Sequence, residues 1–131
     1  MTRYVPDSTV LIEFSKGVEP TTSRVLELVA ESAQLSICAV QVAEFYAGAP
    51  VGAYPIVDAF LSRLDFVLLT PEMGLAAGTF RRQALEAGLR LATPDALIAA
   101  CARHLGATVL TNNVRDFDKT GVAVEPLGGE G

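Results

Sequence analysis

The stretch Thr93-Pro94-Asp95-Ala96-Leu97-Ile98-Ala99-Ala100-Cys101 predicts a buried helix, and this helix decides the fold class. Thr93 belongs to the residue types that cap free backbone N–H groups, and Pro94 suits the first helical position because its missing N–H needs no partner there. Asp95 then lies in the first turn, where the helix dipole favours a carboxylate. The residues that follow are apolar on almost every face, so we expect the helix to lie between layers of structure.

Asp95 has two interpretations at the start of such a helix. In the first, the carboxylate only stabilises the positive end of the helix dipole, which is the more common role for an acid considered alone. In the second, it binds a metal ion or takes part in catalysis. The remainder of the chain has to decide between these roles.

Composition indicates one globular domain. The chain has 131 residues, of which 50% are hydrophobic and 19% are charged. Its net charge of −5 argues against a broad basic surface for nucleic acids, although a local or metal-bridged contact stays open. Cys38 and Cys101 lie in apolar runs, which is typical of buried free thiols in a reducing compartment. No signal pattern or membrane-length apolar run is present, so we expect a cytoplasmic protein without a membrane contact.

Helical segments alternate with short apolar strands along the whole chain. The strands lack polar alternation, which is typical of a parallel sheet covered on both faces. We therefore predict an α/β/α sandwich with a mainly parallel sheet, formed by a single domain over 1–131 with a loose tail from about residue 127. The predicted strands are at Tyr4–Val5, Leu35–Cys38, Phe66–Leu69, Thr108–Leu110 and Val122–Val124, and the predicted helices are at 8–14, 21–31, 40–47, 56–64, 72–87 and 93–105.

Acidic residues fall where the predicted strands end or the helices begin. Asp7 directly follows the first strand, Glu44 lies one to two turns into the helix after the second, and Asn113 and Asp116 follow the strand at 108–110. Asp95 reaches the same place if its helix begins at that edge. In open α/β sheets, ligands bind beyond the carboxyl ends of the strands. The four acids are therefore predicted to meet at one rim.

Carboxylates gathered in this way repel one another unless a cation joins them. Hard oxygen ligands select Mg²⁺ or Mn²⁺, and such an ion assists hydrolysis of a phosphodiester. For Glu44 an alternative to a role in the acid cluster stays open, because with Gln41 it could form an ordinary solvated helix face. Arg115 could contact a phosphate or pair with a nearby acid. The arginines at 81, 82 and 90 either guide such a phosphodiester substrate or lie on solvated helix faces.

Four segments carry a family resemblance: Val5–Ile12, Val42–Gly48, Pro94–Ala100 and Thr111–Phe117. In this order and spacing they resemble the four motifs of PIN-domain ribonucleases, especially the VapC-type toxins of bacterial and archaeal toxin–antitoxin pairs. The match covers nearly the whole chain. Each motif alone is weakly specific, whereas the four together are strongly specific.

The resemblance implies a fold and a set of residue roles. The fold would be the PIN α/β/α sandwich around a parallel sheet. Asp7 and Asp95 would be the principal Mg²⁺ ligands, directly or through water, and Glu44 and Asp116 would complete the acidic cluster and hold or orient water. Asn113 would be a polar contact at a position where many PIN nucleases carry a further acid.

The resemblance also implies an activity and partners. The protein would be an endoribonuclease, with tRNA or rRNA among the family's targets. A VapB-type antitoxin would bind it and block the site, and the toxin would form a homodimer. A PIN domain of RNA processing, or a catalytically inactive PIN interaction module, remains the alternative.

Two positions depart from the family pattern. Gln41 stands where serine or threonine is frequent, and Pro6 stands where an apolar residue is usual and removes a backbone donor.

A phospho-receiver module on a similar sheet is a different possibility. It would need paired acids after the first strand and a lysine after the last, but Asp7 is followed by Ser8 and the lysines are at 16 and 119.

Overall fold

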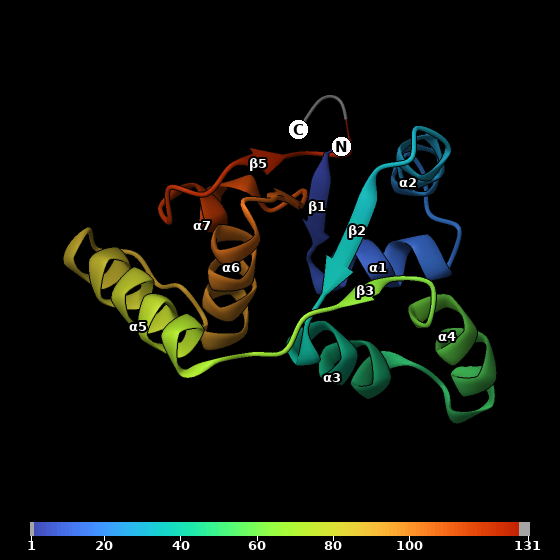
Figure 1. Cartoon of the computed structure of the whole chain (residues 1–131), viewed down its shortest axis with the longest axis horizontal. Coiled ribbons are helices and arrows are strands. Elements are labelled where there is room, and N and C mark those ends of the chain that lie inside the picture. Colours follow the sequence, from blue (N-terminus) through green and yellow to red (C-terminus); the bar gives the residue numbers. More distant parts are fainter. Residues whose placement is uncertain (1, 129–131) are drawn as a thin grey trace.

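The computed structural model describes residues 2–128, in which strands and helices alternate along the chain (Figure 1). The strands are β1 (Arg3–Pro6), β2 (Gln34–Ile37), β3 (Asp65–Phe66), β4 (Thr108–Leu110) and β5 (Val124–Glu125). The helices are α1 (Ser8–Ser15), α2 (Thr21–Ala30), α3 (Ala39–Gly48), α4 (Tyr54–Leu61), α5 (Pro71–Glu86), α6 (Thr93–Leu105) and α7 (Val114–Asp118), with a 3-10 turn, η1 (Val51–Ala53), before α4.

The five strands form one sheet in the order β3-β2-β1-β4-β5, and all neighbouring strands are parallel. The chain leaves the central strand β1 toward β2 and β3, then returns to place β4 and β5 on the other side of β1. The direction of winding therefore reverses between β1 and β4. Ligands bind at such a reversal in open parallel sheets, beyond the carboxyl ends of the strands.

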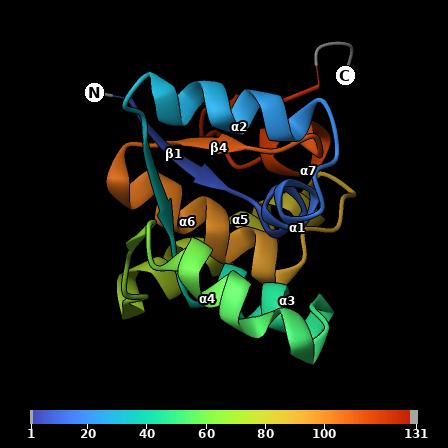
Figure 2. The ribbon, with the colours of Figure 1, turned by 90° about the vertical axis from the view of Figure 1, so that its right-hand side faces the viewer.

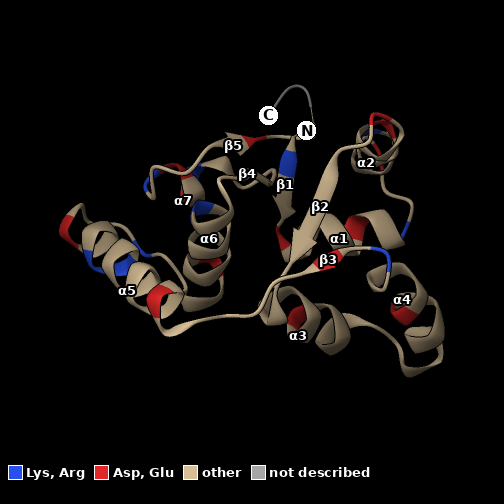
Figure 3. Ribbon diagram, in the orientation of Figure 1, with Lys and Arg blue, Asp and Glu red and all other residues tan. Residues whose placement is uncertain are grey.

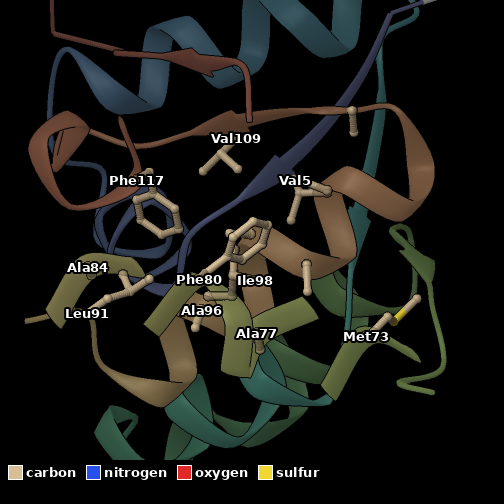
Figure 4. Close-up of a cluster of buried hydrophobic side chains, with 14 residues drawn as sticks. Val5, Met73, Ala77, Phe80, Ala84, Leu91, Ala96, Ile98, Val109 and Phe117 are labelled. Carbon is tan, nitrogen blue, oxygen red and sulfur yellow. The ribbon is translucent and has the colours of Figure 1, made fainter. Parts of the chain in front are cut away.

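Helices cover both faces of the sheet, because alternate strand residues point to opposite sides. Val5 and Val109 pack toward α5 and α6 (Figure 4). Their neighbours Tyr4 and Leu110 pack on the other face, where Leu28 of α2 belongs to the same cluster. Figure 2 shows the strands lying between α2 and α6. The predicted three-layer α/β/α fold is confirmed, and among residues 2–128 its sheet is entirely parallel.

Helix α6 is the buried helix that the sequence predicts. Ile98, Ala99 and Cys101 are fully buried, and Ile98 lies beside Phe80 of α5 in the core (Figure 4). Cys38 is also fully buried, and both thiols are free, as expected. Gly106 ends α6 in the left-handed conformation with a φ of 64°, where a side chain would be strained.

The start of α6 differs from the prediction by one residue. Ala92 is the N-cap, without a side-chain cap, and its carbonyl accepts the first helical hydrogen bond from the N–H of Ala96 at 3.0 Å. Thr93 is therefore already inside the helix, and the predicted capping role of its hydroxyl is wrong. Pro94 takes the second helical position, which tolerates its missing N–H equally well. Asp95 does lie in the first turn.

Other segments also differ from the sequence prediction: α7 is absent from the predicted helices, and β5 begins at Val124 instead of Val122. The continuous strand predicted at Phe66–Leu69 is wrong, because only Asp65–Phe66 pairs at the sheet edge and Leu68 is 74% exposed. The strand β3 is short because it lies at the sheet edge, where it has only one neighbouring strand, and because the chain soon enters α5 at Pro71. Leu127, placed in the loose tail, is instead buried, and its N–H donates to Oδ1 of Asn112 at 2.9 Å. Residues 129–131 of that tail lie outside the described residues.

Candidate active site

Asp7 follows β1 at the point where the sheet reverses its winding, and its carboxylate is held on both oxygens. Oδ1 accepts a 2.9 Å hydrogen bond from the N–H of Val10, so Asp7 is the N-cap of α1. Oδ2 accepts a hydrogen bond from the hydroxyl of Thr111, the residue that directly follows β4. Asp7 is only 5% exposed. The carboxylate is therefore fixed between the ends of β1 and β4.

The two departures from the family pattern, Pro6 and Gln41, both contact the backbone next to Asp7 or form part of it. Pro6 donates no hydrogen bond, but the N–H of Asp7 reaches the carbonyl of Leu110 at 3.0 Å and continues the pairing of β1 with β4. The carbonyl of Pro6 accepts a 3.0 Å hydrogen bond from Nε2 of Gln41. Oε1 of Gln41 in turn accepts from the N–H of Cys38 at 2.9 Å. Gln41 therefore ties the start of α3 to the end of β1.

Asp95 brings a second carboxylate to the same edge from the first turn of α6, where it is half-buried. Burial is the largest cause that raises the pKa of Asp95, which reaches about 6. The negative charges of Asp7, Asp116 and Glu44 also raise it, in that order. The four acids come from separate parts of the chain, and Asp7, Asp116 and Glu44 each lie close enough to Asp95 to act on its charge. The structure therefore brings Asp7, Asp116 and Glu44 within electrostatic range of Asp95, and their roles in a metal or catalytic site stay a prediction.

Burial also raises the pKa of Asp7, although the hydrogen bonds from Thr111 and Val10 oppose the shift. These bonds favour the charged form because the N–H and the hydroxyl donate to the carboxylate. An apolar site would keep such an acid protonated, whereas a bound cation would favour its ionised form. The two acids with raised pKa values, Asp7 and Asp95, are those for which the family resemblance implies metal binding.

Glu44 is not on a solvated helix face. It is half-buried, and its Oε1 accepts a hydrogen bond from the hydroxyl of Ser8, the first residue of α1. Gln41, which the alternative placed on the same solvated face, is 0% exposed and bonded to Pro6. Figure 3 shows acidic residues on α3 and at the carboxyl end of β1.

Asp116 completes the cluster from α7. Its Oδ2 accepts a 2.7 Å hydrogen bond from the side-chain amide of Asn113, whose backbone N–H donates to the hydroxyl of Thr111 at 2.8 Å. Thr111 therefore connects Asp7 to the turn that carries Asp116. Arg115 is exposed and forms no salt bridge with any carboxylate of residues 2–128, so the predicted pairing with a nearby acid does not occur there.

The donor set suits a hard cation, but it limits how that cation is held. Its members are carboxylate oxygens, the ligands that Mg²⁺ prefers. Within residues 2–128, no group of three or more acid, histidine or cysteine side chains converges closely enough to hold an ion alone. Mg²⁺ usually keeps several waters and uses one or two carboxylates. The donor types therefore suit a hydrated ion held by one or two of these carboxylates.

Comparison with known proteins identifies the family. The model of the PIN domain matches residues 4–123. The chain belongs to the PIN-domain family. Similar curated proteins include Ribonuclease VapC2 of Haemophilus influenzae, with 27% identity over 128 residues and 91% of this chain and 92% of that protein covered. The tRNA(fMet)-specific endonuclease VapC of Salmonella typhimurium is 30% identical over 78 residues, 59% of each chain.

Solved structures show the same fold as this PIN domain. VapBC2 from Rickettsia felis, bound to a DNA fragment from its promoter, gives a TM-score of 0.80 with 24% identity, and the match covers 95% of this chain and 98% of that one. DNA-bound VapBC from Salmonella typhimurium gives a TM-score of 0.80 with 23% identity, covering 97% and 99%. At these identities the likeness concerns the fold.

The PIN domain carries site features that the sequence did not assign. Ser8 and Thr111 each bond a carboxylate of the cluster, and both lie inside the recognised motifs, which was the available signal. Beside Asp95 and Asp116 lies a pocket of about 480 Å³ that Arg81 and Arg90 also line.

None of the helices within residues 2–128 has the length and hydrophobicity needed to cross a bilayer.

Proposed function

We propose that this PIN domain is a Mg²⁺-dependent endoribonuclease and the toxin of a VapBC-type toxin–antitoxin pair. The observation that carries the proposal is that Asp7, Glu44 and Asp116 lie within electrostatic range of Asp95, with Asp7 at the point where the sheet reverses its winding. The VapC ribonucleases, similar over about nine-tenths of both chains, support it. Its location would be cytoplasmic.

Asp7 and Asp95 are the proposed Mg²⁺ ligands, with Mn²⁺ as a substitute. When bound, the ion lowers the pKa of a water and stabilises charge on phosphoryl oxygens during phosphodiester hydrolysis. Asp7 is suited to this role because Thr111 and Val10 fix both of its oxygens before any ligand arrives. Asp95 is suited because burial and neighbouring negative charge disfavour its ionised form, and a bound cation would offset both effects.

The other site residues have supporting roles in the proposal. Glu44 and Asp116 would orient water in the cluster, and each is itself oriented by a hydrogen bond from Ser8 or Asn113. Arg115 is exposed beside Asp116 and would contact an RNA phosphate. Asn113 would contribute a polar contact. The proposed substrate is tRNA or rRNA, in keeping with the tRNA-specific endonuclease among the similar proteins.

A VapB-type antitoxin and a second copy of this chain are the proposed protein partners. The structures that share the fold include VapBC complexes from Rickettsia felis and Salmonella typhimurium. A short reading frame for an antitoxin beside the gene, and a stable complex on co-expression, would support the first partner. Light scattering of the purified toxin would test the homodimer.

The decisive experiment compares purified protein and Asp95→Asn on a pool of tRNA and rRNA, with Mg²⁺, with Mn²⁺ and with EDTA. Asp58→Asn, which alters an exposed acid on α4, is the matched control. We expect discrete cuts with either metal, no cuts with EDTA or Asp95→Asn, and normal cuts with Asp58→Asn. Equal cutting by Asp95→Asn would remove Asp95 from the mechanism. Metal binding by the unmodified chain without any cleavage would favour the inactive interaction module.

A further inference from the structure

The pocket beside Asp95 and Asp116 is lined by both positive and negative side chains. Arg81 of α5 and Arg90, in the segment between α5 and α6, line it together with the two acids. Neither arginine lies within salt-bridge distance of a carboxylate among residues 2–128. Figure 3 shows basic residues on α5. The pocket therefore presents cationic groups that the surrounding acids do not neutralise by contact.

Arg81 is anchored in this position. Its Nε donates a 3.0 Å hydrogen bond to the carbonyl of Leu91, which lines the same pocket. A guanidinium has five N–H donors, and this bond uses only the one on Nε. The terminal nitrogens keep the paired geometry that matches two phosphate oxygens. The anchor limits the side-chain freedom that would otherwise be lost on binding.

An RNA strand needs local cations to reach this site. The chain has a net charge of −5, so its overall field repels a polyanion. The acid cluster at the edge repels it further until a metal ion is present. Arg81 and Arg90 would offset that repulsion by attracting one phosphate beside the carboxylates. Leu85 is 62% exposed and offers apolar surface beside this phosphate to a ribose or base.

We infer that the pocket of Arg81 and Arg90 binds the RNA phosphate that flanks the scissile one, and so sets the register of the strand against Asp95 and Asp116. This inference rests on the proposed ribonuclease function. Arg81 provides the paired contact to the phosphate, and Arg90 provides a second positive charge. The ligand class is a single-stranded RNA, because the strand has to enter a pocket of about 480 Å³.

The neighbouring residue provides a matched control. Arg82 is exposed on α5 like Arg81 and carries the same charge, but it does not line the pocket. Arg81→Gln and Arg82→Gln therefore change net charge equally. The probe is a fluorescent 12-nucleotide single-stranded RNA, whose affinity is measured by anisotropy with Ca²⁺ in place of Mg²⁺ over a series of salt concentrations.

We expect Arg81→Gln to weaken RNA binding about tenfold, the usual effect of losing a hydrogen bond to a charged group. We also expect it to lower the slope of log affinity against log salt by about 1, because one phosphate contact is lost. Arg82→Gln should leave both quantities near those of the unmodified chain. Equal effects of the two variants, or no effect of either, would overturn the inference.

Two more variants separate binding from a purely structural role. Arg81→Lys keeps the charge but cannot make the bond from Nε to the Leu91 carbonyl, so we expect intermediate RNA affinity. Arg90→Gln removes a pocket charge that makes no such anchor, and we expect weaker RNA binding at an unchanged Tm. A fall in Tm for Arg81→Gln and Arg81→Lys, with unchanged salt slopes and normal binding by Arg90→Gln, would assign Arg81 to structure only.

Cleavage in Mg²⁺ distinguishes failure of this inference from failure of the proposed function. If both Arg81→Gln and Arg90→Gln cut RNA normally with unchanged KM, the inference of a phosphate pocket is wrong and the proposed nuclease function stands. If the unmodified chain binds the probe through Arg81 but never cuts RNA, the proposed nuclease function is wrong and the inference of a phosphate pocket stands. Where both hold, we expect KM to rise about tenfold in Arg81→Gln, with a smaller change in kcat.

Discussion

The side chain of Gln41 donates a 3.0 Å hydrogen bond to the carbonyl oxygen of Pro6, the residue that precedes the catalytic candidate Asp7. The two residues are 35 positions apart in the chain, and each departs from the family pattern. Pro6 lacks an N–H, so its carbonyl is the only backbone group by which it can be held. Gln41 is long enough to reach that carbonyl while its own oxygen caps α3 through Cys38. The glutamine thus performs a positioning role that a shorter hydroxyl would perform differently.

We expect Gln41→Ala to destabilise the protein and to impair the site. The change leaves the Pro6 carbonyl and the Cys38 N–H without partners in a fully buried place, where each unsatisfied group costs about 1–3 kcal/mol. The expected loss in the free energy of unfolding is about 3 kcal/mol in urea titrations. Gln83→Ala, at an exposed position of α5, should change it by less than about 0.5 kcal/mol. Similar values for both variants would show that the Gln41 bonds contribute little.

We expect Thr111→Val to weaken metal binding while the fold is kept. Valine matches the shape of threonine but cannot donate to Oδ2 of Asp7 or accept from the N–H of Asn113. Loss of a residue that orients a metal ligand commonly lowers metal affinity about 10–100-fold. Calorimetric titration with Mn²⁺ measures this. Thr79→Val, which removes a hydroxyl bonded only within α5, is the control and should bind Mn²⁺ normally.

The sequence predicted the parts of the site that depend on chain order. Strand ends and helix starts are visible in a sequence, and parallel strands place their ends on one edge. Asp7 could therefore be placed at this edge from the sequence, and Asp95 on the condition that its helix begins there. The bond between Thr111 and Asp7 spans 104 positions and depends on side-chain direction, which sequence patterns do not specify. The anchoring of Arg81 by Leu91 was hidden for the same reason.

The errors in the predicted fold have a similar origin. The apolar run at Phe66–Leu69 resembles a central strand, but whether a strand has one neighbour or two is decided by the whole sheet, and β3 lies at the edge. Thr93 was a reasonable cap by residue type. The hydrogen bond from Ala96 to the carbonyl of Ala92 moves the helix start by one residue, a shift within the usual uncertainty of helix ends.

The pKa of Asp95 predicts how stability changes with pH in the absence of metal. Its folded value of about 6 lies above the usual value of about 3.9 for an unfolded chain. Between these values the folded state holds more protons than the unfolded state, so the free energy of unfolding falls as pH rises through this window. Below about pH 4 both states are protonated and the penalty vanishes.

We therefore expect Asp95→Asn to be more stable than the unmodified chain at pH 7 in EDTA, and about equally stable at pH 4. Urea unfolding at pH 4, 5, 6 and 7 measures the difference between the two proteins, which should grow over this range. Asp58→Asn, outside the acid cluster on α4, is measured in parallel as the control. A difference that stays constant with pH would show that Asp95 does not carry the unfavourable charge.

Added Mg²⁺ should reverse that penalty, because a cation that binds only the folded state stabilises it by mass action. At a concentration 100 times its Kd the gain is about 2.7 kcal/mol, visible as a rise in Tm. The rise should be larger at pH 8 than at pH 5, since protons compete for Asp95 below its pKa of about 6. Asp95→Asn should show a smaller rise at pH 8, with ionic strength matched by KCl. The same rise in both proteins would place the ion elsewhere, and the role of Asp95 as a ligand would be wrong.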